Sequence, residues 1–177
     1  MGIPTLISTS TASDAANVDI TSGIDSTYDE YMFVFTDINP ATNDANFQFQ
    51  VNAASASGFN ETITSTFFRA YHLEDGSAAS LDYVTGLDQA QGTAYQGLIY
   101  GIGNGTDECG AGILHLFSPS STTYVKHFYS RANPYDGSTT RESYSAGYIN
   151  TTAAIDEISF KMTSGNFDGV IQMYGIS

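Results

Sequence analysis

The residue types that most often bind metals or act as nucleophiles are few in this sequence, and they are far apart. The histidines are His72, His115 and His127, and the single cysteine is Cys109. No two histidines have the short spacing of a metal-binding pair, and none lies beside the cysteine. The sequence therefore predicts no metal site. We expect His115 to be a satisfied or surface residue of a strand, and His72 to end a strand at a polar turn.

Cys109 lies in the glycine-rich segment NGTDECGAG, directly after Asp107 and Glu108. Neighbouring carboxylates raise the pKa of a thiol and so disfavour the reactive thiolate. A single cysteine also excludes an internal disulfide framework. We therefore predict that Cys109 is a small, structurally neutral residue.

The same region, GIGNGTDECGAG from Gly101 onward, is the segment that most resembles a phosphate-binding loop. It lacks the lysine of such a loop and no helix pattern follows it, so we predict a hairpin loop instead. No GxSxG nucleophile elbow is present. A Ser-His-Asp triad or a pair of glycosidase carboxylates can be built from residues far apart in sequence, so both stay open. We identify no catalytic, cofactor-binding or metal-binding residue and predict a protein that is not an enzyme.

Strand-forming runs recur along the chain, and turn residues separate them. In residues 47–51, Phe and Val alternate with Gln, which predicts one buried and one wet face. Residues 31–36 are apolar on both faces, which predicts a central strand, and Asn39-Pro40 then breaks it. Residues 77–92 fit a loop, a short helix or a ragged edge strand. The other expected strands are 3–9, 66–73, 95–102, 113–117, 124–130, 144–150, 157–162 and 169–176.

About ten strands and no convincing amphipathic helix predict an all-β fold: a two-layer antiparallel β-sandwich, jelly-roll-like, with residues 1–177 as a single domain. The last strand, 170–176, should pair within a sheet. We expect six aromatic residues in the core or at its border, namely Phe33, Phe35, Phe47, Phe49, Phe160 and Tyr174.

Nineteen acidic residues oppose five basic ones, which gives a formal net charge of −14. Five scattered bases cannot form the basic track that nucleic acid requires, and an anionic membrane is disfavoured for the same reason. No run of about 18 apolar residues exists that could span a bilayer. We interpret the acidity as a source of solubility and mutual repulsion, and carboxylates gathered around calcium stay open as the alternative.

Three segments resemble one family of small tailed-bacteriophage virion proteins: residues 22–52, 114–128 and 151–176. The most specific parts are TYDEY from Thr27, INPATND from Ile38, and SGNFDG followed by the YGI ending at Ile176. Residues 55–110 match the family poorly. The resemblance therefore covers both ends and the middle of the chain.

The resemblance implies a compact β-sandwich on the exterior of a virion, as a capsid decoration or a tail-associated protein. It carries over no catalytic residue. It implies other virion proteins (major capsid or tail proteins) as partners and assembly in the host bacterial cytoplasm. We also expect a symmetric homo-oligomer, with residues 95–102 as a candidate apolar contact. The alternative is a receptor- or glycan-binding tail fibre or adhesin module, in which Tyr135 or a tyrosine in 95–100 stacks on host-surface sugars.

Overall fold

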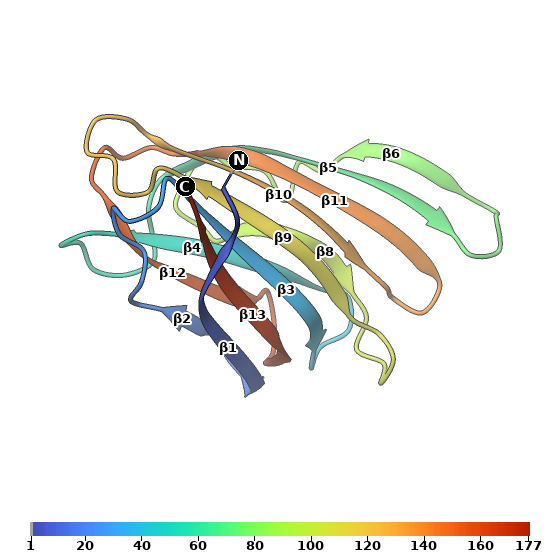
Figure 1. Ribbon diagram of the computed structural model, residues 1–177. Coiled ribbons are helices and arrows are strands. Elements are labelled where there is room, and N and C mark those ends of the chain that lie inside the picture. Colours follow the sequence, from blue (N-terminus) through green and yellow to red (C-terminus); the bar gives the residue numbers. More distant parts are fainter. Residues whose placement is uncertain (1) are drawn as a thin grey trace.

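Thirteen β-strands and their connecting turns form the computed structural model, which describes residues 2–177. No helix occurs within that range. The strands form two antiparallel sheets, of nine and four strands, that pack against each other as a sandwich (Figure 1). This confirms the predicted all-β, two-layer antiparallel sandwich in a single domain.

The chain passes repeatedly between the two sheets. The four-stranded sheet contains, in spatial order, β2 (Val18–Ile20), β12 (Ile155–Met162), β4 (Ala45–Ala53) and β8 (Gln96–Ile102). The nine-stranded sheet contains β1 (Thr5–Ala15), β13 (Phe167–Ile176), β3 (Glu30–Pro40), β9 (Gly110–Phe117), β10 (Lys126–Pro134), β11 (Thr139–Ile149), β5 (Ile63–Leu73) and β6 (Ala79–Tyr83), with the short β7 (Ala90–Gly92) also paired to β5.

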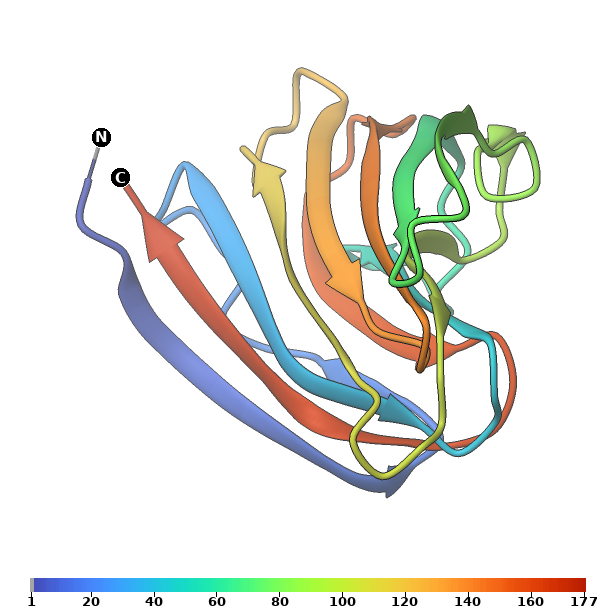
Figure 2. The ribbon, with the colours of Figure 1, turned by 90° about the vertical axis from the view of Figure 1, so that its right-hand side faces the viewer.

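The large sheet is strongly curved, as Figure 2 shows. Strand β8, at the edge of the small sheet, packs against β9, β10 and β11. The end of the large sheet that contains β6 and the second half of β5 extends past β8 (Figure 1). At this end of the large sheet, the side that elsewhere packs on the small sheet is not covered by it. The opposite side faces solvent along the whole sheet.

The core between the sheets is aromatic. Phe33 and Phe35 of β3 and Phe47 and Phe49 of β4 are wholly or almost wholly buried, as is Phe160 of β12. The Phe35 ring lies edge-on to Phe47 at 5.2 Å between centroids, a geometry that adds to the hydrophobic gain of burial. These five predicted core residues are confirmed, and β3 is central as predicted because it pairs with both β13 and β9.

Tyr174 was expected in the core or at its border, and this expectation is wrong. Its side chain is half-buried and lies on the solvent side of β13, in phase with Gln172. The inward positions of this strand are Ile171 and Met173, because side chains alternate along a strand. Both phases of the segment are apolar, so its pattern alone could not fix which one faces the core.

Several strand boundaries differ from the predicted ones. Strand β11 begins at Thr139 instead of residue 144, and β2 was not predicted. The ambiguous segment 77–92 contains two short strands, β6 and β7. Both pair with β5, on the edge of that strand opposite to β11. The glycine-rich loop after β8 is not a hairpin, because β8 belongs to the small sheet and β9 to the large one. Strand β3 does end at Pro40, as predicted.

Candidate functional site

The three histidines lie on one face of the large sheet but form no site together. His115 and His127 alternate with buried neighbours on β9 and β10, and His72 alternates with the half-buried Tyr71 and Leu73 on β5. His115 is nearly buried, contacts the Glu30 carboxylate through Nδ1, and stacks on the Tyr129 ring at 4.6 Å. Among residues 2–177, no three His, Cys, Asp or Glu side chains come close enough together to hold a metal ion.

The solvent side of β9, β10, β11, β5 and β6 is aromatic and aliphatic, and we call it the outer face. Several of its large side chains are well exposed: Leu81 at 70%, Tyr83 at 53%, Tyr129 at 44% and Phe68 at 39%. Strand pairing places Phe68 directly between Tyr144 and Tyr83 in one row across the sheet. Exposure of large apolar side chains to water is unfavourable, and contiguous exposed apolar surface often marks a site of protein contact. The outer face has the composition of such a contact surface.

The outer face carries no net formal charge. Its two charged side chains, Arg131 of β10 and Glu142 of β11, form an ion pair with each other. The Arg131 guanidinium also lies 5.7 Å from the centre of the Tyr144 ring. In a chain with a net charge of −14, the side chains of these strands thus form a neutral region, which two carboxylates from other segments border: Glu30 contacts His115, and Asp88 accepts a hydrogen bond from the Tyr83 hydroxyl.

The aromatic rings of the outer face stack against one another. Phe68 and Tyr144 are nearly parallel, with 4.8 Å between centroids and 11° between planes. His115 and Tyr129 are stacked in the same way. In each of these pairs, one face of each ring is covered by its neighbour. A sugar ring stacks on an open aromatic face, so this arrangement suits an apolar protein contact better than a glycan.

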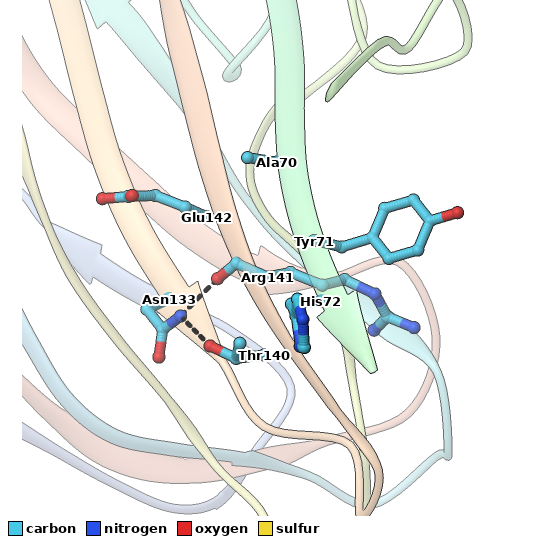
Figure 3. A pocket seen from close by; sticks show the side chains of 7 residues that line it. All are labelled: Ala70, Tyr71, His72, Asn133, Thr140, Arg141 and Glu142. Carbon is cyan, nitrogen blue, oxygen red and sulfur yellow. Dashed lines mark hydrogen bonds between the residues drawn. The ribbon is translucent and has the colours of Figure 1, made fainter. Parts of the chain in front are cut away.

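On the other side of the same sheet, the end that extends past β8 contains a recess of about 120 Å³. It is lined by Arg69, Tyr71 and Leu73 of β5 and by Thr139 and Arg141 of β11, and we call it the arginine recess. Tyr71 and Arg141 are directly opposite in the strand register. Figure 3 shows these two side chains pointing to one side of the strands, while Glu142 and Asn133 lie on the other.

The Arg141 guanidinium is held in place by contacts within the fold. Its Nη1 donates a hydrogen bond to the backbone oxygen of Gly101 at 2.6 Å, and its guanidinium forms an ion pair with Asp136. Gly101 has a φ of +67°, and a Cβ there would lie 2.7 Å from Nη1 of Arg141. A glycine is therefore required at this position both by the backbone conformation and by the close approach of the guanidinium.

Arg69 is held by aromatic rings instead of by hydrogen bonds. Its guanidinium carbon lies 4.5 Å from the centre of the Tyr100 ring and 5.1 Å from that of Tyr71. Its Nε is buried and has no hydrogen-bond partner among the described residues. The nearest carboxylate oxygen, from Asp82 of β6, lies 3.6 Å from Nη2, beyond ordinary hydrogen-bond distance. Arg69 and Asp82, which are directly opposite in the β5–β6 register, therefore form a long ion pair, and only the Nη groups of Arg69 could reach a ligand in the recess because Nε is buried.

The structure corrects the expected apolar contact at residues 95–102. Strand β8 is almost wholly buried, so residues 95–102 do not form a free apolar surface. Tyr95 is half-buried and its hydroxyl donates to Ser159 at 3.0 Å, while Tyr135 is half-buried and paired through its backbone to Thr140. Tyr100 alone reaches a candidate site, and there it contacts the arginines.

Cys109 is half-buried, and its thiol pKa is raised, as predicted. The causes differ from the expected ones: burial contributes most, and the carboxylate of Asp37 contributes next. Glu108 turns back into its own loop, where its carboxylate accepts a hydrogen bond from the backbone nitrogen of Gly105 at 2.6 Å. A Cβ at Gly103 would lie 2.1 Å from the same carboxylate, so the loop holds an acid where a phosphate-binding loop would hold a phosphate.

Sequence reasoning missed one buried cation. The Lys126 side chain is wholly buried, and its ammonium donates to the backbone oxygens of Tyr124 at 3.1 Å and Thr151 at 3.2 Å. Burial lowers the pKa of Lys126, and the nearby Glu61 carboxylate partly opposes this shift. The signal was present in the sequence, because Lys126 is in phase with Phe128 on a strictly alternating strand.

The described part of the chain contains no helix that could cross a membrane. Comparisons of the chain with protein-family models, with curated proteins and with solved structures found no significant match. The arguments that follow therefore rest on the outer face, on the arginine recess, and on the resemblance of the three segments described above.

Proposed function

We propose that the chain is a non-enzymatic accessory protein on the exterior of a tailed-bacteriophage particle, as a capsid decoration or a tail-associated protein. It docks through the outer face onto a major capsid or tail protein. The observation that carries this proposal is the uncharged aromatic outer face on a chain with a net charge of −14. The resemblance of residues 22–52, 114–128 and 151–176 to virion proteins supplies the kind of partner.

The charge distribution explains why this face would make the contact. Any acidic surface of the chain that is pressed against a partner must lose the hydration of its carboxylates. The outer face reduces this cost, since its one carboxylate, Glu142, keeps the Arg131 guanidinium as a partner when water is removed. Burial of Phe68, Leu81 and Tyr129 is favourable at roughly 25 cal/mol per Å² of apolar surface.

A second copy of the chain is a weaker candidate for the occupant of the outer face. Two chains would bring together a formal charge of −28, which is twice the −14 of one chain. That repulsion opposes self-association more than it opposes binding to a partner of lower charge. In this proposal the symmetric homo-oligomer follows the symmetry of the particle, whose sites position the copies.

The test measures binding of the purified chain to particles that lack it. We expect saturable binding at sites that obey the particle's symmetry. Tyr129→Asp and Leu81→Asp each place an unpaired charge on the outer face and should weaken binding by at least about tenfold, as hot-spot losses do. Tyr124→Asp is the matched control, because Tyr124 is 74% exposed but lies in the loop before β10.

Each result of this test has a defined meaning. Equal losses for all three variants would remove the outer face from the proposal. Absence of specific binding by the wild-type chain, or hydrolysis of a bacterial polysaccharide by it, would overturn the function itself. If sedimentation instead shows a dimer that Tyr129→Asp dissociates, the outer face is a contact between copies of this chain and the docking proposal is wrong.

A further inference from the structure

The arginine recess and the outer face lie on opposite sides of one sheet. Arg69 and Tyr71 alternate along β5 with Phe68 and Ala70, and side chains two residues apart share a side. A contact on the outer face therefore leaves the recess open. In the docked protein that we propose, the recess faces away from the partner.

The chain places two of its five basic residues at this recess, and the contacts of Arg141 are closer than those of Arg69. Arg141 is occupied by the Gly101 carbonyl and by Asp136. Arg69 is oriented by cation–π contacts to Tyr71 and Tyr100 and by a long ion pair with Asp82, and its Nη groups donate no hydrogen bond to any described residue. A pre-oriented guanidinium with free donors in a recess has the geometry of an oxyanion ligand.

We propose that the arginine recess binds the carboxylate of an acidic sugar residue, a uronic acid, with the Arg69 guanidinium as its ligand. A carboxylate matches the planar fork of a guanidinium with two parallel hydrogen bonds. A ligand with one negative charge also suits this site better than a ligand with two. Asp82 lies 3.6 Å from Arg69, and the chain as a whole is strongly acidic, so a phosphate dianion would be repelled.

The remaining lining of the recess suits a sugar. Tyr71 and Thr139 bring hydroxyl groups that can donate or accept hydrogen bonds, and Leu73 brings an apolar surface for ring C–H groups. The direction in which the recess faces rests on the proposed function, because a docked chain turns it toward the medium and the host surface. The binding of the sugar itself does not depend on docking.

The experiment is a ¹H–¹⁵N NMR titration of the full chain, including the Arg69 Nε–H signal. The probes are glucuronate, glucose as the uncharged sugar, and acetate as the bare carboxylate. We expect saturable shifts around residues 69–73 and 139–141 with glucuronate, weaker binding of acetate, and no binding of glucose. Arg69→Gln should weaken glucuronate binding at least about tenfold, the scale of a lost charge-assisted pair.

Two further variants separate a ligand from a structural residue. Asp82→Asn removes the carboxylate that competes for Arg69, so it should tighten glucuronate binding by a few-fold. Arg131→Gln is the control, since it removes an arginine from the outer face and should leave the titration unchanged. Thermal unfolding of each variant checks that it is folded. A change in packing alone would not weaken binding in one variant and tighten it in the other.

Every outcome bears on the proposal. No shifts at the recess with glucuronate, or unchanged glucuronate binding by a folded Arg69→Gln variant, would overturn it. Equal affinities for acetate and glucuronate would show that the recess recognises carboxylates in general and that the sugar assignment is wrong. Binding of glucose as tight as that of glucuronate would remove Arg69 from the site. A chain that binds glucuronate but no particle would refute the proposed docking and leave the sugar site standing.

Discussion

Arg131 of β10 and Glu142 of β11 are diagonal neighbours, since Arg131 lies directly opposite Tyr144, and their side chains form an ion pair on the outer face. The guanidinium lowers the pKa of the Glu142 carboxyl by hydrogen bonding, which keeps this acid ionised and paired. The Arg131 side chain is well exposed and that of Glu142 is partly exposed, so solvent screens the pair and it contributes little to folding. Its larger effect is to make the aromatic surface around it electrically neutral.

Arg131→Gln should therefore separate stability from docking. We expect the melting temperature to change little, because exposed ion pairs are weak. Docking onto particles should weaken, since an unpaired Glu142 carboxylate would have to lose its hydration in the contact. Differential scanning calorimetry and a particle-binding assay measure the two effects. The double variant with Glu142→Gln should bind better than Arg131→Gln alone, and failure of this rescue would contradict the explanation.

Phe49→Asp should be severely destabilising. The Phe49 ring is wholly buried and lies edge-on to Phe128 from the opposite sheet at 5.1 Å between centroids. An aspartate there would be an unpaired charge in the core and would leave a cavity, which together are expected to exceed about 4 kcal/mol. Urea unfolding measures the loss. Gln48→Asp, on the opposite side of the same strand, is the control and should unfold close to wild type.

Lys126 should make stability depend on pH in the alkaline range. Its pKa is lowered in the folded protein, so at neutral pH, below both the folded and the unfolded pKa, the fold bears the full penalty of a buried ammonium. Stability should rise as pH increases through the folded pKa toward the unfolded value near roughly 10.4. This gain requires a lysine at position 126.

Comparison with Lys126→Met isolates this effect. The variant also loses the hydrogen bonds to Tyr124 and Thr151, but that loss does not change with pH. The free energy of unfolding of the wild type should therefore improve relative to the variant between neutral pH and about pH 9.5, a range below ordinary tyrosine titration. A difference that stays constant over this range, measured by urea unfolding, would show that the folded pKa of Lys126 is not depressed into it and would contradict the prediction.

Deletion of Gln172–Ser177 should prevent the chain from folding to a soluble protein. Strand β13 lies inside the large sheet, paired with β1 on one side and β3 on the other. The deletion would break backbone hydrogen bonds on both sides and remove the buried Met173. Expression followed by gel filtration provides the measurement. A monodisperse truncated protein with cooperative unfolding would mean that these residues are dispensable.

The sequence by itself determined the fold class and most of the strands that build the core. Strict alternation at Phe47, Phe49 and Val51 is sufficient because a period of two assigns side chains to one face without knowledge of the neighbouring strands. It was insufficient where both phases are apolar, as around Tyr174, and where a strand is short and exposed, as in β6. There the pairing partner decides, and the partner can lie anywhere in the sequence.

Only the tertiary structure brought the candidate sites together. Arg69, Tyr100 and Arg141 are distant in sequence and come from β5, β8 and β11, so no local pattern connects them. The ion pair of the outer face likewise depends on the register that sets Arg131 opposite Tyr144 and so brings it diagonally beside Glu142. Alternation states which side chains share a strand face, whereas long-range strand pairing and the packing of the two sheets decide what each face meets.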